Sequence, residues 1–241
     1  MSTPQAGPTD MSALIDDLVT ANRILAHYGV LDGYGHVSVR HPVRPDQYLI
    51  SCSRAPELIT ADDIMEFDSD SSPVGGDERK PYLERFIHGE IYRARPDVQA
   101  IVHSHSPSVI PFSASSVRLR PICHMAGFLR GDTPVFDLRS HFGTTDLLIR
   151  NCAHGKELAK SLGQGSVALM RGHGFVAVGE SVQMAVYRAM YTETNSALQQ
   201  KAVALGGDIT FLDDAEAATA DESVSTTVSR PWELWKRRVC T

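Results

Sequence analysis

The segment Val98-Gln99-Ala100-Ile101-Val102-His103-Ser104-His105-Ser106-Pro107 is the stretch from which the predicted fold is built. Its apolar run predicts a short β-strand that ends in two histidines two residues apart. Because strand side chains alternate between faces, His103 and His105 point the same way, roughly 6.5–7 Å apart along the strand. Two such imidazoles suit a single metal ion, but on their own they equally describe a plain polar strand end. Partners elsewhere in the chain decide between these interpretations.

The composition is that of an ordinary globular protein. The chain has 241 residues, of which 42% are hydrophobic and 22% charged, and a formal net charge of -6. A chain of this length can bury the core of one α/β domain. No basic face is concentrated enough to predict nucleic-acid or membrane binding, and no apolar run approaches the ~20 residues of a spanning helix.

The ends of the chain and its cysteines bear on organisation and location. Residues 1–10 lack the apolar core of a signal peptide and are predicted to be a disordered lead before one domain at 11–241 with a C-terminal tail. The four cysteines form no C-x-x-C pair, which favours reduced thiols and a cytoplasmic location. Trp232 and Trp235 in the tail are expected to dock on another subunit or on the protein's own core.

Hydrophobic periodicity predicts an α/β domain with a mixed, largely antiparallel sheet. We expect Ser12 to cap the first helix and Pro81 to stand in the first turn of the second. Helices are predicted at 11–28, 81–95, 144–162 with a break near 151–154, 181–205 and 213–228. Strands are predicted at 37–40, 48–51, 64–67, 98–105, 118–120, 135–136, 166–171 and 175–178.

Two further segments supply partners for the paired histidines. Gly172-His173-Gly174 forms a predicted tight turn between two strands, and its glycines allow the backbone to approach a site closely. Three imidazoles leave coordination positions open on a divalent ion, as a catalytic site requires. Glu84 stands nineteen residues before His103, where a helix packed against the strand would bring it back toward the metal as a general acid or base. A first-turn acid that stabilises the helix dipole is the plainer interpretation.

The loop Cys52-Ser53-Arg54-Ala55-Pro56-Glu57 combines hydroxyl and guanidinium groups. Both suit a carboxylate or phosphate, so the loop fits an anion pocket as well as it fits an ordinary turn.

In order and spacing, these motifs resemble the class II aldolase/adducin family, whose sugar-phosphate members include fuculose-phosphate aldolase. The resemblance covers about residues 11–205 and rests on Gly35-His36-Val37-Ser38-Val39-Arg40, Glu84-Arg85-Phe86, Arg95-Pro96-Asp97-Val98, His103-Ser104-His105 and Gly172-His173-Gly174. It implies a three-layer α/β/α domain with a mainly antiparallel sheet, commonly assembled as a tetramer with sites at subunit interfaces. It also implies His103, His105 and His173 as ligands of a divalent metal, either Zn, Mn or Fe, with Glu84 as the acid/base residue.

The chain departs from the sugar-phosphate pattern at three places. His36 stands where those members carry an asparagine, Tyr82-Leu83 where they carry two serines, and Ser51-Cys52-Ser53-Arg54 near their Thr-Gly turn. The replacements are aromatic and cationic, which suits a flat aromatic carboxylate.

Three segments, 53–57, 81–90 and 230–236, resemble a branch of the family that decarboxylates hydroxylated aromatic dicarboxylates of the hydroxy-methylpyridine-dicarboxylate and dihydroxyphthalate types. The resemblance therefore implies a metal-dependent carbon–carbon lyase in which His36, Ser53, Arg54 and Tyr82 bind the substrate. The alternatives are an aldolase that cleaves a sugar, a mononuclear iron oxygenase and an adducin-like scaffold without activity. The complete set of Glu84 and three histidines argues against the scaffold.

Overall fold

The computed structural model describes residues 10–239. Its centre is a seven-stranded sheet in the order β3-β2-β1-β4-β7-β6-β5. Every neighbouring pair is antiparallel except β5 with β6, which confirms the predicted mixed, mainly antiparallel α/β fold. The strands are β1 (His36–Arg40), β2 (Tyr48–Ser51), β3 (Ile64–Phe67), β4 (Ala100–Ser104), β5 (Val135–Phe136), β6 (Val167–Met170) and β7 (Gly174–Gly179).

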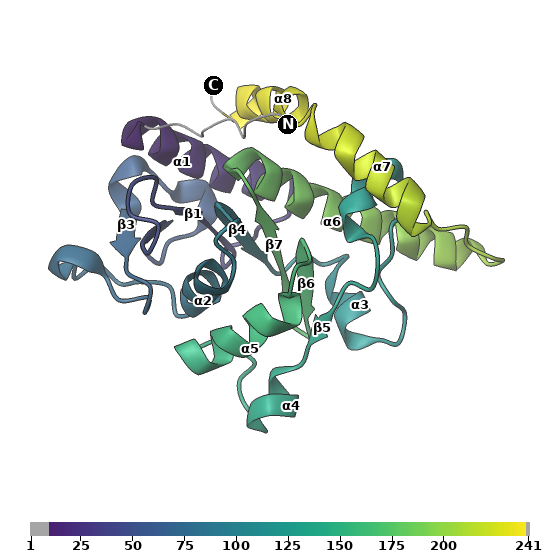
Figure 1. Ribbon diagram of the computed structural model, residues 1–241, viewed down its shortest axis with the longest axis horizontal. Helices are drawn as coiled ribbons and strands as arrows, with labels where there is room; N and C mark the ends of the chain where they lie inside the picture. The colour runs from purple at the N-terminus through teal and green to yellow at the C-terminus, as the bar shows by residue number, and fades with distance from the viewer. Residues whose placement is uncertain (1–9, 240–241) are drawn as a thin grey trace.

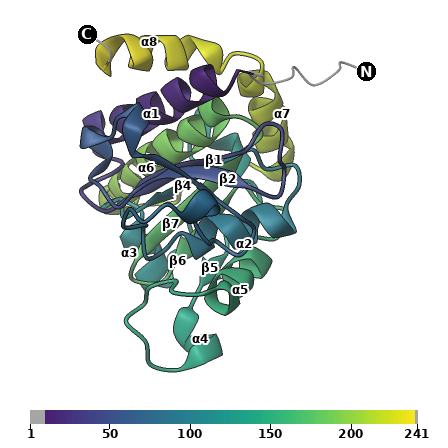
Figure 2. The ribbon, with the colours of Figure 1, turned by 90° about the vertical axis from the view of Figure 1, so that its left-hand side faces the viewer.

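Helices cover both faces of the sheet, as Figures 1 and 2 show. On one face lie α1 (Met11–His27), α6 (Val182–Leu205) and α8 (Ser229–Val239), and on the other lie α2 (Phe86–Ala94) and α5 (Cys152–Leu162). Shorter elements complete the chain: α3 (Ile110–Ala114), α4 (Leu138–Phe142), α7 (Asp214–Ser225), and the 3-10 helices η1 (Pro56–Leu58), η2 (Ala61–Asp63), η3 (Val74–Gly76) and η4 (His124–Leu129).

The sheet separates two apolar clusters, and β4 contributes to both. Val102 packs in the cluster under α1 and α6, whereas Ile101 packs in the cluster under α2 and α5. Because successive strand residues face opposite layers and both layers are apolar, the strand is a continuous hydrophobic run rather than an alternating one. This central position makes β4 a rigid support for the histidines at its end.

The two ends of the described chain pack together. Asp10, rather than the predicted Ser12, caps α1, because its side chain accepts a hydrogen bond from the Ser12 backbone N–H. The remainder of the predicted disordered lead lies outside the described residues. Trp232 and Trp235 are buried in the cluster that includes α1 and α6, so of the two predicted docking surfaces the tail uses the protein's own core. None of the helices within residues 10–239 is both long and apolar enough to cross a membrane.

One predicted helix begins later than expected, and one predicted strand is absent. The helix expected from Pro81 begins at Phe86, because Pro81 pairs with Cys52 in a β-bridge. The strand expected at 118–120 is absent, since the side chains of Asn195 and Gln199 on α6 bind the backbone of that segment in place of a neighbouring strand.

Candidate metal centre

Three histidines converge where β4 and the β6–β7 turn meet. His103 lies in β4 opposite Val176 of β7, His105 follows the end of β4, and His173 lies in the turn that leads into β7. The Nε2 atom of His105 is 3.1 Å from Nε2 of His103 and 3.0 Å from Nε2 of His173. The fold therefore brings together the three residues that the sequence nominated.

Gly174 is what allows this approach. A Cβ atom at this position would lie 2.0 Å from the carbonyl oxygen of Ser104, so any other residue would push the β6–β7 turn away from β4. Gly172 adopts φ of 64°, a left-handed conformation that glycine takes without strain. The two glycines around His173 are thus required by the close contact and by the turn.

The tautomers of the histidines follow from their other ring nitrogens. Nδ1 of His103 is 3.1 Å from the carbonyl oxygen of Phe175, and Nδ1 of His173 is 3.0 Å from that of Leu147. A carbonyl oxygen only accepts, so each Nδ1 carries the hydrogen and each Nε2 presents a lone pair. Nδ1 of His105 lies 3.7 Å from the Asp32 carboxylate, which favours the same tautomer.

Three lone pairs that point at one another repel unless a cation lies between them. Nitrogens held at about 2.0–2.1 Å from a common ion are about 3.0–3.4 Å apart, and the measured Nε2 separations of 3.0 and 3.1 Å fall in this range. His103, His105 and His173 therefore fit a divalent metal as a three-nitrogen set that leaves other coordination positions open.

Glu84 completes the group, and its atoms lie with those of the histidines within 4.8 Å of one another. Its Oε2 is 3.3 Å from Nε2 of His173 and 3.6 Å from Nε2 of His103. Its Oε1 accepts a hydrogen bond of 2.9 Å from the backbone N–H of Ile149. Glu84 precedes α2 rather than standing in its first turn, so the dipole interpretation gives way to a carboxylate held at the site.

The electrostatics of the group favour an ionised carboxylate. Burial acts to raise the pKa of Glu84, but the adjacent His103 and His173 lower it by more, and the net pKa lies below the usual range. Burial acts to lower the pKa of His173, and the Glu84 carboxylate raises it overall. Burial and then the charges of its two histidine neighbours lower the pKa of His105 to about 4. Negative charge on Glu84 thus coexists with a neutral His105 at neutral pH.

A loop at 144–150 replaces the first half of a predicted helix and orients two members of the group. Helix α5 begins only at Cys152. Leu147 adopts φ of 68°, which ends any helical course, and its carbonyl turns toward His173. The Ile149 N–H, which would bond within a helix, instead binds Glu84. The prediction failed because these bonds come from residues distant in sequence.

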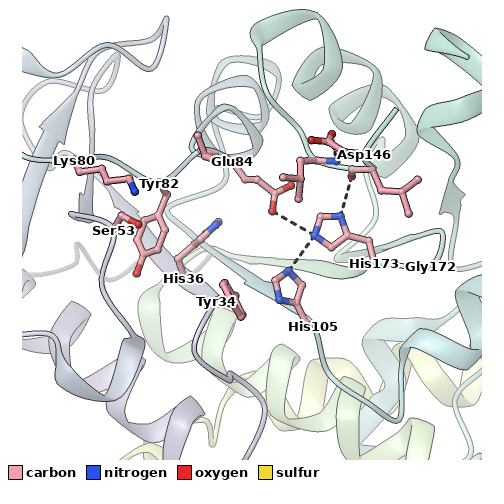
Figure 3. A pocket seen from close by; sticks show the side chains of 13 residues that line it. Tyr34, His36, Ser53, Lys80, Tyr82, Glu84, His105, Asp146, Gly172 and His173 are labelled. Atoms are coloured by element: carbon pink, nitrogen blue, oxygen red, sulfur yellow. Dashed lines mark hydrogen bonds and ion pairs between the residues drawn. The ribbon is translucent and has the colours of Figure 1, made fainter. Parts of the chain in front are cut away.

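Glu84, His103, His105 and His173 are called the metal-binding group below, as candidate residues for an ion. Three of its members, Glu84, His105 and His173, line a cavity of about 560 Å³. Figure 3 shows Glu84, His105 and His173 together on one side and Tyr82, His36 and Ser53 on the other. Leu83, Leu147 and Leu148 add apolar surface to the wall. Apolar lining with a few polar groups is typical of small-molecule sites.

His36 and Tyr82 line the cavity with their rings. His36 of β1 pairs in register with His103 of β4, and its ring centroid lies 4.6 Å from that of Tyr82 and 5.0 Å from that of His103. The Tyr82 hydroxyl donates to the carbonyl of Arg54. Tyr82 therefore presents its ring, rather than its hydroxyl, to the cavity.

The loop before the cavity places Ser53 and Arg54 differently. Ser53 lines the cavity, and its backbone N–H donates to the Lys80 carbonyl at 2.8 Å. The Arg54 guanidinium donates to both carboxylate oxygens of Asp63, at 3.0 and 2.9 Å, and Arg54 is not among the lining residues. Its role in substrate binding stays a prediction.

Lys80 lines the cavity but was missed by the sequence reasoning. It belongs to the polar segment 68–80, which shows no periodicity and offers no motif. The backbone bond to Ser53 and the Cys52–Pro81 bridge carry Lys80 to the cavity beside Tyr82. The one sequence signal that could have indicated Lys80 is its position two residues before the nominated Tyr82.

Comparisons with known proteins agree with this geometry. The profile of the class II aldolase and adducin N-terminal domain matches residues 16–200. The decarboxylase tropJ of Talaromyces stipitatus is 42% identical, over 92% of each chain. The 3,4-dihydroxyphthalate decarboxylase of Arthrobacter keyseri is 31% identical, over 83% of each chain. The solved L-fuculose 1-phosphate aldolase of Glaciozyma antarctica is 24% identical and superposes with a TM-score of 0.78, covering 97% of this chain and 93% of that one.

Proposed function

This chain belongs to the class II aldolase and adducin family, and from this premise we propose that it is a divalent-metal-dependent decarboxylase of hydroxylated aromatic dicarboxylates. One observation carries the proposal. The lone pairs of three imidazoles and the carboxylate of Glu84 meet beside a cavity with aromatic and aliphatic walls, and all but His103 line it.

The chemistry divides between the ion and the protein. A bound divalent cation would act as a Lewis acid for the negative charge that develops on a ring oxygen as the carbon–carbon bond breaks. The ionised Glu84 Oε2 takes the proton of the ring hydroxyl and returns it to the ring carbon that loses CO2. The electron pair of the broken bond forms the new C–H bond, so atoms and charge balance.

Substrate recognition falls to the cavity walls. The Tyr82 ring and the leucines pack against an aromatic ring and keep water from it. The Lys80 ammonium attracts the carboxylate that remains on the product. A dihydroxyphthalate or a hydroxypyridine-dicarboxylate meets both requirements, and the names of tropJ and of the Arthrobacter relative support a decarboxylase.

An aldolase is the main alternative, because the solved fuculose-phosphate aldolase has the same fold. Its support is weaker, since Tyr82 and Leu83 line the cavity where the sugar-phosphate pattern carries hydroxyls. A mononuclear iron oxygenase would use the same three histidines but would consume oxygen.

The test combines metal analysis with three product assays. Elemental analysis of the purified protein identifies the bound ion. The metal-loaded protein is then given 3,4-dihydroxyphthalate, a hydroxypyridine-dicarboxylate or fuculose 1-phosphate, while CO2, aldehyde and oxygen are followed. We expect one CO2 per aromatic substrate, without oxygen uptake. Aldehyde release from the sugar phosphate alone, or stoichiometric oxygen uptake, would replace the proposal with the corresponding alternative.

We further propose a cytoplasmic homotetramer. The side chains of Tyr34 and Leu83 at the cavity are 74% and 52% exposed, and an adjoining subunit would cover such apolar surface. Free thiols at Cys52, Cys123 and Cys152 suit a reducing compartment. Light scattering of the purified protein at several concentrations tests the assembly.

A further inference from the structure

A chain of buried hydrogen bonds runs from the cavity wall into the layer behind the sheet. Nδ1 of His36 lies 2.7 Å from Nε2 of His88, and Nδ1 of His88 lies 2.6 Å from Oγ of Ser38. Oγ of Ser38 lies 2.8 Å from the hydroxyl of Tyr92. Strand β1 supplies two members and α2 the other two, and all four residues are at least 95% buried.

The chain contains four mobile hydrogens and three links. His36 and His88 are 2% and 0% exposed, and burial disfavours a charged imidazolium, so each ring carries one hydrogen. Tyr92 and Ser38 carry one hydroxyl hydrogen each. If every hydrogen points toward the cavity, Tyr92 donates to Ser38, Ser38 to His88 and His88 to His36.

The opposite direction leaves a buried donor unsatisfied. His36 would donate to His88, His88 to Ser38 and Ser38 to Tyr92, and the Tyr92 hydroxyl hydrogen would then lack an acceptor among residues 10–239. A buried donor without a partner destabilises the fold. If both Tyr92 and His88 donate to Ser38, the hydroxyl hydrogen of Ser38 likewise lacks an acceptor. Every arrangement thus leaves one hydrogen without a protein partner. In the first direction this hydrogen is at Nε2 of His36, which lines the cavity, whereas in the other two it is on the hydroxyl of Tyr92 or Ser38, away from that cavity.

We propose that Ser38 and His88 are positioning residues that hold His36 as the Nε2–H tautomer, so that His36 donates a hydrogen bond to an anionic substrate oxygen. His36 lines the cavity, and its Nε2 has no hydrogen-bond partner in the described part of the chain. Figure 3 shows its ring between Tyr82 and the metal-binding group. With the Lys80 ammonium, His36 makes this wall a pair of donors, which is the complement of a carboxylate.

The inference rests on the proposed function for the identity of its ligand, and it assigns recognition of the second carboxylate to His36 together with Lys80. The substrate carries a second carboxylate in addition to the hydroxy-carboxylate edge that faces the metal-binding group. The pair 3,4-dihydroxyphthalate and 2,3-dihydroxybenzoate isolates this difference, because the second compound keeps the hydroxy-carboxylate edge and lacks the other carboxylate.

The first test observes the tautomer directly. Histidine-labelled, zinc-loaded protein is studied by nitrogen–proton NMR, and the His36 signals are assigned by their loss in His36→Asn. We expect the protonated-type nitrogen shift at Nε2 in the wild type and in Tyr92→Phe, where Ser38 still donates to His88. In Ser38→Ala no hydroxyl donates to His88, so nothing fixes the direction of the hydrogen bonds. We then expect intermediate shifts at both nitrogens of His36. Protonation at Nδ1 in the wild type overturns the proposal whether or not any variant folds.

The second test measures recognition. Calorimetry compares the two probes on zinc-loaded Glu84→Gln protein, in which turnover should be slowed by about 10²-fold or more. His36→Phe removes the donor, so it should weaken the binding of 3,4-dihydroxyphthalate about tenfold or more. The affinity for 2,3-dihydroxybenzoate should change little. In Ser38→Ala both tautomers of His36 are populated, so the affinity for the dicarboxylate should fall about twofold. Tyr48→Phe, which removes a buried hydroxyl outside the chain of bonds, is the matched control.

The outcomes separate this inference from the proposed function. If the Nε2–H tautomer and the preference for the dicarboxylate are found without CO2 release, the decarboxylase proposal fails and the inference stands. If CO2 is released but both probes weaken equally in His36→Phe, His36 does not recognise the second carboxylate.

Discussion

The carbonyl oxygen of Leu147, a residue with φ of 68°, lies 3.0 Å from Nδ1 of His173. A left-handed leucine is uncommon and costs roughly 1–2 kcal/mol, so the loop holds this conformation only because its other contacts outweigh the strain. One such contact is the Ile149 N–H on Glu84. The same short loop therefore sets the tautomer of a candidate ligand and the position of the candidate acid.

This relationship predicts that two substitutions at Leu147 differ in their effect on zinc affinity. Leu147→Val places a β-branched residue in the left-handed region and should lower zinc affinity about tenfold, because the carbonyl that orients His173 moves. Leu147→Asn removes the same apolar side chain but tolerates this backbone conformation, so it should bind zinc nearly as the wild type does. Competition with a chelator measures both affinities, and equal losses in the two variants would mean that the side chain matters rather than the backbone.

Metal binding should stabilise the fold through the three histidines. Saturating zinc at about 100 times the dissociation constant adds about 2.7 kcal/mol to the free energy of unfolding, which thermal denaturation detects as a higher Tm. His105→Ala should abolish this rise, since two imidazoles remain. His124→Ala, which changes an exposed histidine outside the group, should preserve it. A zinc-dependent rise that survives in His105→Ala would place the bound ion elsewhere.

Glu84→Gln should lower turnover of 3,4-dihydroxyphthalate by about 10²–10⁴-fold, because an amide cannot carry the proton. The amide oxygen can still accept the Ile149 N–H, so the loop and the metal content should remain. CO2 release and elemental analysis on the same sample measure the two effects. Glu57→Gln at an exposed position is the control. Turnover close to that of the wild type would remove Glu84 from the reaction.

Stability of the metal-free protein should fall as the pH drops from about 6.5 toward 3. Burial, together with the charge of His103, lowers the pKa of His88 to about 3 in the folded protein, whereas an unfolded histidine titrates near 6.5. Within this window the unfolded state binds the additional proton, so acid favours unfolding, with a slope of up to about 1.4 kcal/mol per pH unit.

Denaturant unfolding of the wild type and of His88→Gln at several pH values isolates this contribution. The difference between the two curves should shrink as the pH falls and level off above 6.5. Parallel curves over the whole window would show that His88 is not held neutral.

Gly174→Ala should destabilise the protein by several kcal/mol, since its Cβ would meet the Ser104 carbonyl at 2.0 Å. The same movement should separate His173 from His105 and weaken metal binding. Gly33→Ala is the matched control, because its Cβ would have no atom within 4 Å. Chemical denaturation and chelator competition give the two readouts. An equal effect of both substitutions would mean that the contact between the β6–β7 turn and β4 is relaxed in solution.

Elements whose conformation is decided by the pattern of their own residues were predicted well from the sequence. The apolar period of α1 and the alternation of β1 are local, and tertiary packing had only to agree with them. The same is true of the β6–β7 turn, where the two glycines around His173 indicate a close approach. The four residues nominated for the metal-binding group, which the fold brings together, stood in motifs of this kind.

Features that depend on distant partners could not be predicted in this way. Residues 144–150 carry leucines at helical spacing, but hydrogen bonds to Glu84 and His173 decide their conformation. Arg54 lies in a loop that suits an anion, but its guanidinium donates to the carboxylate of Asp63 in η2. Lys80 belongs to a stretch without pattern, and a backbone bond from Ser53 brings it to the cavity. In each case the deciding interaction joins segments that the sequence gives no reason to pair.

The packing of α8 against the start of the chain has a consequence for biosynthesis. Trp235 lies beside Tyr28 at the end of α1 and beside Tyr191 of α6, with ring centroids 6.2 and 6.4 Å apart. About 200 residues separate α1 from this tryptophan, which at roughly 5–20 residues per second is on the order of 10–40 s of translation. During that interval a nascent α1 exposes part of its apolar face on the ribosome. Chains interrupted before Trp235 would keep that face uncovered, which makes them natural clients of chaperones and proteases.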